Sequence, residues 1–415
     1  MNPSAHPQWG FVGVGEAGTR IVSTYLERTG GVAVDDRFLF ATTNQAGLRR
    51  VLDRVASELP ADAARIAADH LVTFGQRSDV GTDFAAGKRA ADSDFETLRE
   101  GITIALDGAD SVVYPLGLGG GTGNGTVPYL IDRLSRVSVT DSPPAWIAGL
   151  THFALGVWPF EHESSARHFN AICGLSRLLA RDDGAPNADM TLLASNSRLQ
   201  ELAAAGEEGD AGHSANDGKA DDSDHSADEL ARINDLLVAA LELFVGAGQG
   251  GGHVVTGSEF ADVPQQRGIA HATVGTALGK PVGLDVSHVI DRAVENAFVP
   301  LDPTTAGAAF AVVRAPRARV EAGDVTSGRV QEAFATWEAE RGLRNTAGTT
   351  KLLADPDATG LDALVVLGGF DLDPLLASSW ERYERVKAEL RDSELREALD
   401  CAERAETTLD RYRSG

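Results

Sequence analysis

The residues best suited to chemistry form a glycine-rich loop, which reads Leu-Gly-Leu-Gly-Gly-Gly-Thr-Gly-Asn-Gly-Thr over residues 116–126. An apolar run at 110–114 precedes this loop and an amphipathic segment at 127–134 follows it, which predicts a strand, a tight loop and a helix. Glycines let backbone N–H groups approach a ligand closely, and a helix N-terminus adds its dipole and further N–H donors. We therefore expect the loop to bind phosphate. The alternative is a turn that packs a helix close to a sheet.

A second glycine cluster has the spacing G-x-G-x-x-G at Gly13, Gly15 and Gly18. Asp35 and Asp36 follow at about the distance from which an acidic residue binds a ribose in dinucleotide-binding folds. An enzyme that uses a nicotinamide dinucleotide is therefore an alternative. It leaves the glycines at 119–125 unexplained, and the sequence contains no convincing hydride-transfer site.

Two carboxylates, Glu259 and Asp262, lie three residues apart beyond a strongly apolar helix that we expect at 230–244. Two acids on one turn can point into the same pocket and orient a water molecule near a metal-bound phosphate. The structural alternative is that Ser258 caps a helix whose first turn is acidic. A helix of about fifteen residues spans over 20 Å at roughly 1.5 Å per residue, so acids beyond its far end would not easily reach a phosphate in their own molecule.

Strands that alternate with helices must position these residues, and this alternation predicts a doubly wound, Rossmann-like α/β fold with ligands at the carboxyl ends of parallel strands. In the first half we expect a helix at 46–59 and strands at 38–44, 71–74, 110–114, 146–150 and 190–196. A second, smaller α/β domain is predicted by helices near 286–297 and 330–341 and by strands at 269–275, 308–314 and 363–369.

Five segments follow from these elements and from changes in composition. We expect a nucleotide-binding domain at 10–229, a long central linking helix at 230–249, an α/β domain at 250–370 and a charged carboxyl-terminal helix at 377–413. Inside the first domain, residues 203–227 are rich in Gly, Ala, Asp and Ser and predict a disordered acidic insertion.

The formal net charge of −24 argues against a surface that binds nucleic acid or anionic membranes. An acidic surface with few lysines is typical of a protein adapted to high salt, and the lysines are Lys88, Lys219, Lys280, Lys351 and Lys387. Two cysteines, Cys173 and Cys401, predict no disulfide framework and favour a reducing cytoplasm. No apolar run reaches membrane-spanning length, so direct membrane insertion is not expected.

The motifs resemble, in matching order, those of the tubulin/FtsZ family of GTPases, of the FtsZ-like or CetZ-like kind. Residues 119–125 match the family loop G-G-G-T-G-[SAN]-G, and residues 260–263 are identical to the last four residues of its N-L-D-F-A-D-V loop. Further similarities lie at 13–18, 42–44 and 81–87. Residues 159–161 with Arg167 resemble the family's ribose loop, and 190–196 and 234–235 resemble the segments that carry its guanine-side asparagines, here Asn196 and Asn234. Glu259 stands in place of the family's aspartate, Gly257 in place of its asparagine, and Leu230 in place of a base-stacking phenylalanine.

The resemblance implies a site for GTP or GDP, with Mg²⁺ bound through the phosphates rather than by a protein metal centre. The implied nucleotide contacts are Gly15, Glu16, Ala17, Gly18, Arg20, Thr43, Asn44, Gly81, Gly119, Gly120, Gly121, Thr122, Gly123, Asn124, Glu161, Arg167, Asn196, Leu230 and Asn234. The implied catalytic residues are Glu259 and Asp262, which would act on the nucleotide of the next subunit.

The implied function is that of a cytoplasmic cytoskeletal GTPase that assembles head to tail into filaments, with itself or with other FtsZ-like subunits. An alternative is an FtsZ-like scaffold or regulator that binds GTP but hydrolyses it weakly or does not polymerise. Roles in cell division and in cell shape are both compatible with the sequence. The changes at 257 and in the glycine run at 246–252 predict slow turnover.

Overall fold

A computed structural model describes residues 8–29, 37–49, 70–75, 80–136, 146–210, 222–248, 257–281, 283, 285–341, 349–391 and 396–413. The strands are β1 (Trp9–Val14), β2 (Phe38–Thr42), β3 (Leu71–Thr73), β4 (Ser111–Gly117), β5 (Thr151–Trp158), β6 (Met190–Ser195), β7 (His271–Lys280), β8 (Ala308–Pro316), β9 (Thr349–Asp355) and β10 (Leu361–Gly368). The α-helices are α1 (Gly15–Thr29), α4 (Phe84–Ser93), α5 (Phe95–Ala105), α6 (Thr122–Ser135), α7 (Ser165–Leu179), α8 (Asn196–Asp210), α9 (Asp222–Gly246), α10 (Gly257–Gln266), α11 (Val286–Glu295), α12 (Arg317–Glu321), α13 (Ser327–Glu340), α14 (Asp373–Arg391) and α15 (Arg396–Leu409).

The strands form one sheet in the order β3-β2-β1-β4-β5-β6-β7-β10-β8-β9. Every pair from β3 to β7 is parallel, so these strands all end at the same edge of the sheet. β10 runs antiparallel to both β7 and β8, and β9 pairs in parallel with β8 at the outer edge.

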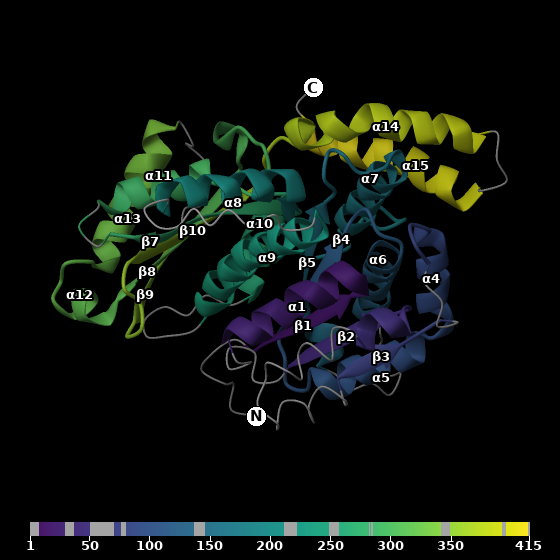
Figure 1. The fold of residues 1–415 in the computed structure, drawn as a ribbon, viewed down its shortest axis with the longest axis horizontal. Helices are drawn as coiled ribbons and strands as arrows, with labels where there is room; N and C mark the ends of the chain where they lie inside the picture. Colours follow the sequence, from purple (N-terminus) through teal and green to yellow (C-terminus); the bar gives the residue numbers. More distant parts are fainter. Residues whose placement is uncertain are drawn as a thin grey trace.

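The parallel part of the sheet is covered on both faces, which confirms the expected α/β fold. Along β1, Val12 and Val14 join one hydrophobic cluster, with residues of α4, α5, α6 and α7. Trp9 and Phe11 alternate with them and join a second cluster, with residues of α1 and α9. Figure 1 shows α1, in purple, lying beside α9.

The antiparallel part of the sheet has its own hydrophobic cluster, in which β7, β8 and β10 pack against α11 and α13. The largest aromatic side chains of this cluster, Phe334 and Trp337, lie on α13 and stack with ring centroids 5.5 Å apart. Because β7 joins β6 to β10, the two proposed α/β domains share one continuous sheet. The division at 229–250 stays a prediction.

The strand expected at 146–150 is wrong. Ile147–Gly149 form a 3₁₀ turn, closed by hydrogen bonds from Gly149 N–H to Trp146 C=O (3.0 Å) and from Leu150 N–H to Ile147 C=O (3.3 Å). The strand β5 begins directly after this turn, where Thr151 pairs with Ser111 of β4. An apolar run by itself does not distinguish a strand from a buried turn, and here the pairing with β4 decides the boundary.

The single carboxyl-terminal helix expected at 377–413 is also wrong, because α14 and α15 are two helices that both contact α7. Figure 1 shows them as a yellow pair lying over α7. The Tyr383 hydroxyl of α14 donates a hydrogen bond to the Ala402 carbonyl of α15 (2.7 Å). A helical pair buries apolar residues from both of its members against α7, whereas one straight helix would bury a single stripe.

Two other segments differ from expectation. The predicted acidic insertion at 203–227 is partly helical, because α8 continues to Asp210 and α9 begins at Asp222, and residues 211–221 lie outside the described residues. Alanine and glutamate are good helix formers, so an acidic composition does not exclude a helix. The residues expected on a turn at 259–262 lie within the helix α10. None of the helices that the structure describes combines the length and apolar character needed to span a bilayer.

Candidate functional site

The glycine loop connects the end of β4 to the start of α6. Gly120 N–H donates to Gly117 C=O (3.2 Å), which closes the turn after the strand. The first backbone hydrogen bond of α6 runs from Gly125 N–H to Gly121 C=O (2.9 Å), so the amides at 122–124 precede the helical ladder. A Cβ atom at Gly120 would meet only Gly117 O, 3.5 Å away, so the loop leaves room beside its backbone. Converging amides at a helix N-terminus fit a phosphate group.

The first glycine cluster lies directly against this loop. Gly15 has φ +70°, and a Cβ atom there would lie 3.1 Å from the amide nitrogen of Gly123. A Cβ atom at Gly18 would lie 2.2 Å from the carbonyl oxygen of Pro115 in β4. Only glycine therefore lets α1 begin this close to the phosphate loop. Ala17 takes part in the same close packing, because a Cβ at Gly117 would lie 3.1 Å from the Cβ of Ala17.

Two further loops reach the glycine loop through hydrogen bonds. The hydroxyls of Thr43 and Thr122 are 2.9 Å apart, which joins the end of β2 to the start of α6. Gly121 N–H donates to the carbonyl of Gly81 (2.9 Å), which joins the loop before α4. Asn44 follows Thr43, and its Oδ1 accepts the N–H of Gly47 (3.0 Å) as a helix cap. The structure thus gathers the ends of β1, β2 and β4 and the loop before α4 at one place.

The side chain of Asn124, one of the expected nucleotide contacts, is turned into the protein. Its side chain is fully buried, and its Nδ2 donates to the carbonyl oxygens of Leu118 and Asn170 (2.7 Å to Asn170). Its Oδ1 accepts a hydrogen bond from Arg177. The side chain is therefore used by the protein itself and fixes the shape of the loop, and only the backbone of this residue remains for a phosphate.

Asn170 of α7 contacts the glycine loop, and the sequence analysis did not single it out. Its Nδ2 donates to the carbonyl oxygens of Thr82 (2.7 Å) and Gly119 (3.1 Å), so it holds the loop before α4 against the glycine loop. A polar residue within an amphipathic helix carries no local signal of such a role. The contacts of Asn170 depend on the packing of α7 against α6, which is a tertiary contact.

The proposed ribose segment follows β5 and runs into α7. Arg167 forms an ion pair with Glu163 (3.0 Å), and a Cβ at Gly119 would lie 3.0 Å from the Cβ of Arg167. Arg167 is therefore adjacent to the glycine loop. Glu161 N–H donates to the Ser197 hydroxyl (3.0 Å), and Glu161 lines a pocket of about 430 Å³ at the carboxyl ends of β5 and β6.

Five further proposed nucleotide contacts lie on the helices α1, α8 and α9. Asn196 begins α8 at the end of β6, and Asn234 is nearly buried on α9. Leu230, one turn before Asn234, is half-buried and packs against the second hydrophobic cluster. Glu16 and Arg20 form an exposed ion pair of 2.8 Å on α1, which packs against α9. These positions lie at the start of α1 and at the carboxyl end of the sheet, but no contact between the two asparagines is seen among the described residues.

The proposed catalytic acids Glu259 and Asp262 belong to α10, and the structure describes their backbone but not their side chains. The helix ends next to the start of β6, because Gln265 Nε2 donates to the carbonyl oxygen of Asp189 (2.7 Å), the residue before that strand. The glycine loop instead follows the end of β4. Since β4 and β6 run in the same direction, α10 and the glycine loop lie at opposite edges of the sheet.

Aromatic packing also places α10 far from the glycine loop. The ring of Phe260, between the two acids, stacks on Phe244 of α9 with centroids 4.4 Å apart. The ring centroids of Phe244 and Trp9 are 5.4 Å apart, and Trp9 is the first residue of β1. β4 is seven residues long, and a strand of this length spans roughly 23 Å. The sheet therefore separates Phe260 from the glycine loop by about the length of a strand.

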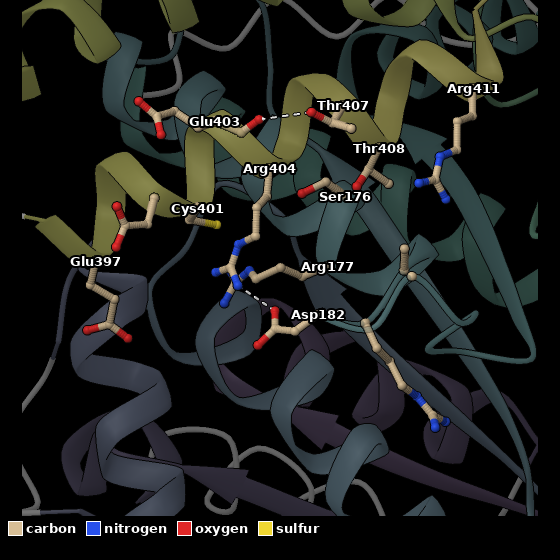
Figure 2. A pocket seen from close by; sticks show the side chains of 14 residues that line it. Ser176, Arg177, Asp182, Glu397, Cys401, Glu403, Arg404, Thr407, Thr408 and Arg411 are labelled. Carbon is tan, nitrogen blue, oxygen red and sulfur yellow. Dashed lines mark hydrogen bonds and ion pairs between the residues drawn. The ribbon is translucent and has the colours of Figure 1, made fainter.

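A larger pocket, of about 630 Å³, lies away from these loops, between α7 and α15. Figure 2 shows Arg177 and Arg404 pointing toward one another across it, and Arg404 pairs with Asp182. Cys401 lines the pocket beside them and is a near neighbour of Cys173 of α7, so the fold brings together two cysteines that are far apart in sequence. Burial raises the pKa of the Cys173 thiol, while Cys173 and the nearby arginines lower the pKa of Cys401.

No group of three or more metal-binding side chains is found in the ranges that the structure covers. The glycine cradle and the amides of α6 instead suit a phosphorylated ligand, which would bring its own cation. The residues Asp35 and Asp36, on which the dinucleotide alternative depends, lie outside the described residues.

The model of the Tubulin/FtsZ family, GTPase domain, matches residues 10–204. The tubulin-like protein CetZ2 of Haloferax volcanii is 28% identical over 410 residues, which cover 95% of this chain and 93% of CetZ2. Cell division protein FtsZ 1 of Pyrococcus abyssi is 29% identical over 196 residues, which cover 46% of this chain and 42% of that protein.

Solved structures show the same fold. CetZ2 from Haloferax volcanii, in a GTPγS-bound protofilament, superposes with a TM-score of 0.67 at 20% identity, covering 92% of this chain and 99% of that chain. An empty FtsZ dimer from M. jannaschii superposes with a TM-score of 0.59 at 20% identity, covering 87% of this chain and 88% of that chain.

Proposed function

We propose that the chain, whose residues 10–204 match the GTPase domain of the Tubulin/FtsZ family, binds GTP and GDP at the glycine loop and assembles head to tail. Hydrolysis would take place where two subunits meet, with Glu259 and Asp262 of one subunit acting on the nucleotide of the next. We propose slow turnover, a cytoplasmic location and Mg²⁺ that is carried on the phosphates. The observation that carries this proposal is the placement of the glycine loop and α10 at opposite edges of one sheet.

Phosphate binding is supported by the convergence of four segments on the start of α6. Gly15, Thr43 and Gly81 all approach residues 121–123, and each approach is made by backbone atoms or a short hydroxyl side chain. The glycine loop at 116–126 contains no lysine, so the backbone amides and the dipole of α6 would stabilise the negative charge of the phosphates. Such a site binds diphosphates and triphosphates without a buried cation.

Assembly is supported by the impossibility of completing the site within one subunit. The acids of α10 are separated from the glycine loop by about the length of a strand, so they serve a nucleotide only if a second subunit stacks on the first. A contact between two different surfaces of the same molecule is heterologous and propagates into a filament. CetZ2 from Haloferax volcanii was solved as a protofilament, and this chain shares its fold.

A second candidate function is a GTP-binding scaffold that hydrolyses weakly or does not polymerise. The specific observation in its favour is Gly257, which begins α10 where the family has an asparagine. Loss of an amide side chain beside the acids would weaken the orientation of a water molecule. Rate and assembly measurements distinguish this scaffold from the hydrolysing filament.

The test combines GTP turnover with sedimentation over a range of protein concentrations, in buffer of high potassium chloride content. We expect GTP and GDP to bind in preference to NAD, the specific activity to rise with protein concentration, and GTP to promote pelleting. Replacing both Glu259 and Asp262 with alanine should abolish turnover, keep GTP binding and give longer-lived assemblies. Glu332→Ala, on the exposed side of α13, is the control and should change none of these.

Two results would overturn the proposal in different ways. Preferential binding of NAD would exclude a guanine-nucleotide site. A specific activity that stays constant on dilution, in a protein that remains monomeric with GTP, would refute the shared site. GTP binding without turnover or pelleting would favour the scaffold.

A further inference from the structure

Helix α14 makes a buried polar contact with the segment that follows β5. The Ser379 hydroxyl of α14 accepts a hydrogen bond from Trp158 Nε1 (2.9 Å) and lies 2.7 Å from His168 Nδ1. All three residues are almost completely buried. Ser379 therefore joins the last residue of β5 to the first turn of α7, and the segment between them, residues 159–167, is fixed at both of its ends.

Arg382, one turn further along α14, holds the middle of the same segment. Its Nη1 donates to the carbonyl oxygens of Glu161 and Glu163 (3.1 Å to Glu163) and lies 2.5 Å from His168 Nε2. One guanidinium thus contacts three residues within eight positions of the chain, and two of these contacts are to the backbone. Such contacts set the path of the main chain rather than the identity of its side chains.

The charge of His168 is consistent with this arrangement. Burial and the neighbouring Arg382 both lower the pKa of His168. The neutral ring then accepts a hydrogen bond from Arg382 at Nε2 and donates from Nδ1–H to Ser379. Both nitrogens of His168 are used by α14, so the histidine is a connector between the two helices.

The segment held by α14 also touches the glycine loop. Arg167, which pairs with Glu163, lies against Gly119, and Asn170, one turn later in α7, donates to the Gly119 carbonyl. A displacement of this segment would therefore change both the position of Glu161 and the packing of the glycine loop.

We propose that Ser379 and Arg382 are positioning residues, which hold residues 159–168 so that Glu161 is ready to bind the sugar of the nucleotide. The proposal rests on the proposed function of a guanine-nucleotide site. The carboxyl-terminal helical pair is then part of the binding site, although neither positioning residue touches the nucleotide. Binding would be stronger because the sugar-binding segment is ordered before the ligand arrives.

The first experiment needs no nucleotide. Hydrogen–deuterium exchange of the full chain should show faster exchange over residues 159–168 in Arg382→Met and Ser379→Ala than in the wild type. Arg385→Met is the matched control, because Arg385 lies on the same helix but is exposed and pairs with Glu381 of that helix (3.1 Å). Unchanged exchange in Arg382→Met would overturn the positioning role, whether or not the protein binds GTP.

The second experiment separates positioning from general destabilisation. Affinities for GTP, GDP and 2′,3′-dideoxy-GTP are compared in the wild type, in the single variants Arg382→Met, Arg382→Lys and Glu161→Gln, and in the double variant that combines Arg382→Met with Glu161→Gln. We expect Arg382→Met to weaken GTP and GDP equally, by roughly tenfold, and to weaken the dideoxy analogue much less, because that ligand lacks the ribose hydroxyls. Arg382→Lys should restore part of the affinity, and the double variant should be no weaker than Glu161→Gln alone.

The outcomes distinguish a failure of the positioning role from a failure of the guanine-nucleotide site itself. An equal loss of affinity for GTP and dideoxy-GTP, or additive effects of Arg382→Met and Glu161→Gln, would refute positioning of a sugar contact while leaving the guanine-nucleotide site intact. A wild-type protein that binds no guanine nucleotide would overturn the proposed function and this inference together. A change in exchange at 159–168 would then describe only a structural contact.

Discussion

Replacing Asn124 with alanine tests whether this residue holds the glycine loop or contacts the nucleotide. The wild-type side chain makes hydrogen bonds to Leu118, Asn170 and Arg177, and it is fully buried. A neutral hydrogen bond contributes about 1 kcal/mol and one to a charged group about 1.5–3 kcal/mol. Arg177 keeps its bond to the Asn124 carbonyl (2.8 Å), which reduces the loss. We expect the free energy of unfolding to fall by on the order of 3 kcal/mol.

The assay is urea unfolding of the nucleotide-free protein, followed by titration with GTP and GDP. Asn187→Ala is the matched control, because Asn187 is also a buried asparagine and its Nδ2 donates to the carbonyl oxygens of Pro128 (2.9 Å) and Arg177 (2.8 Å). Both variants should lose stability. Only Asn124→Ala should also weaken GTP and GDP, and by similar factors, because the shape of the loop serves both ligands.

One result would refute this reasoning directly. If Asn124→Ala unfolds at the wild-type urea concentration and yet loses nucleotide affinity, the side chain points to the ligand and not to the protein. A loss of affinity in Asn187→Ala of the same size would show that reduced stability alone weakens binding.

Three further predictions concern other parts of the fold. Burial lowers the pKa of His152 and His271 to about 4, so each stays neutral in the folded protein below the ordinary value of 6.5. The unfolded chain binds those protons, so the unfolding free energy should fall as the pH is lowered from about 6.5 to about 4, by on the order of 1–3 kcal/mol per histidine. An unfolding free energy that stays constant over this range would contradict the prediction. Cys401 should react with an aromatic disulfide reagent before Cys173, and mass spectrometry of the labelled peptides checks the order. Arg314→Met removes the guanidinium that joins Glu242 of α9 to Asp362 of β10 and leaves Glu242 with Arg28 alone among these partners, so urea unfolding should show a loss of roughly 2–3 kcal/mol.

The glycine positions could be read from the sequence because their requirement is local. Gly15 needs a positive φ, so the chain must carry glycine where this turn is built. The alternation of strands and helices was equally readable, since each apolar period belongs to a single element. For this reason the fold class and the strand, glycine loop and helix at 111–135 could be predicted, while the boundary of the strand near 146–150 could not.

Contacts between distant elements required the tertiary structure. Asn124 has the residue type and position of a phosphate ligand, and only the packing of α7 against α6 turns its side chain into the protein. Ser379 and Arg382 lie more than two hundred residues from the segment they hold, and nothing in their neighbouring sequence marks them. The sequence determined where the backbone can turn and which elements form. Which polar side chains meet was decided by how those elements pack, because hydrogen bonds between them depend on distances that no local pattern encodes.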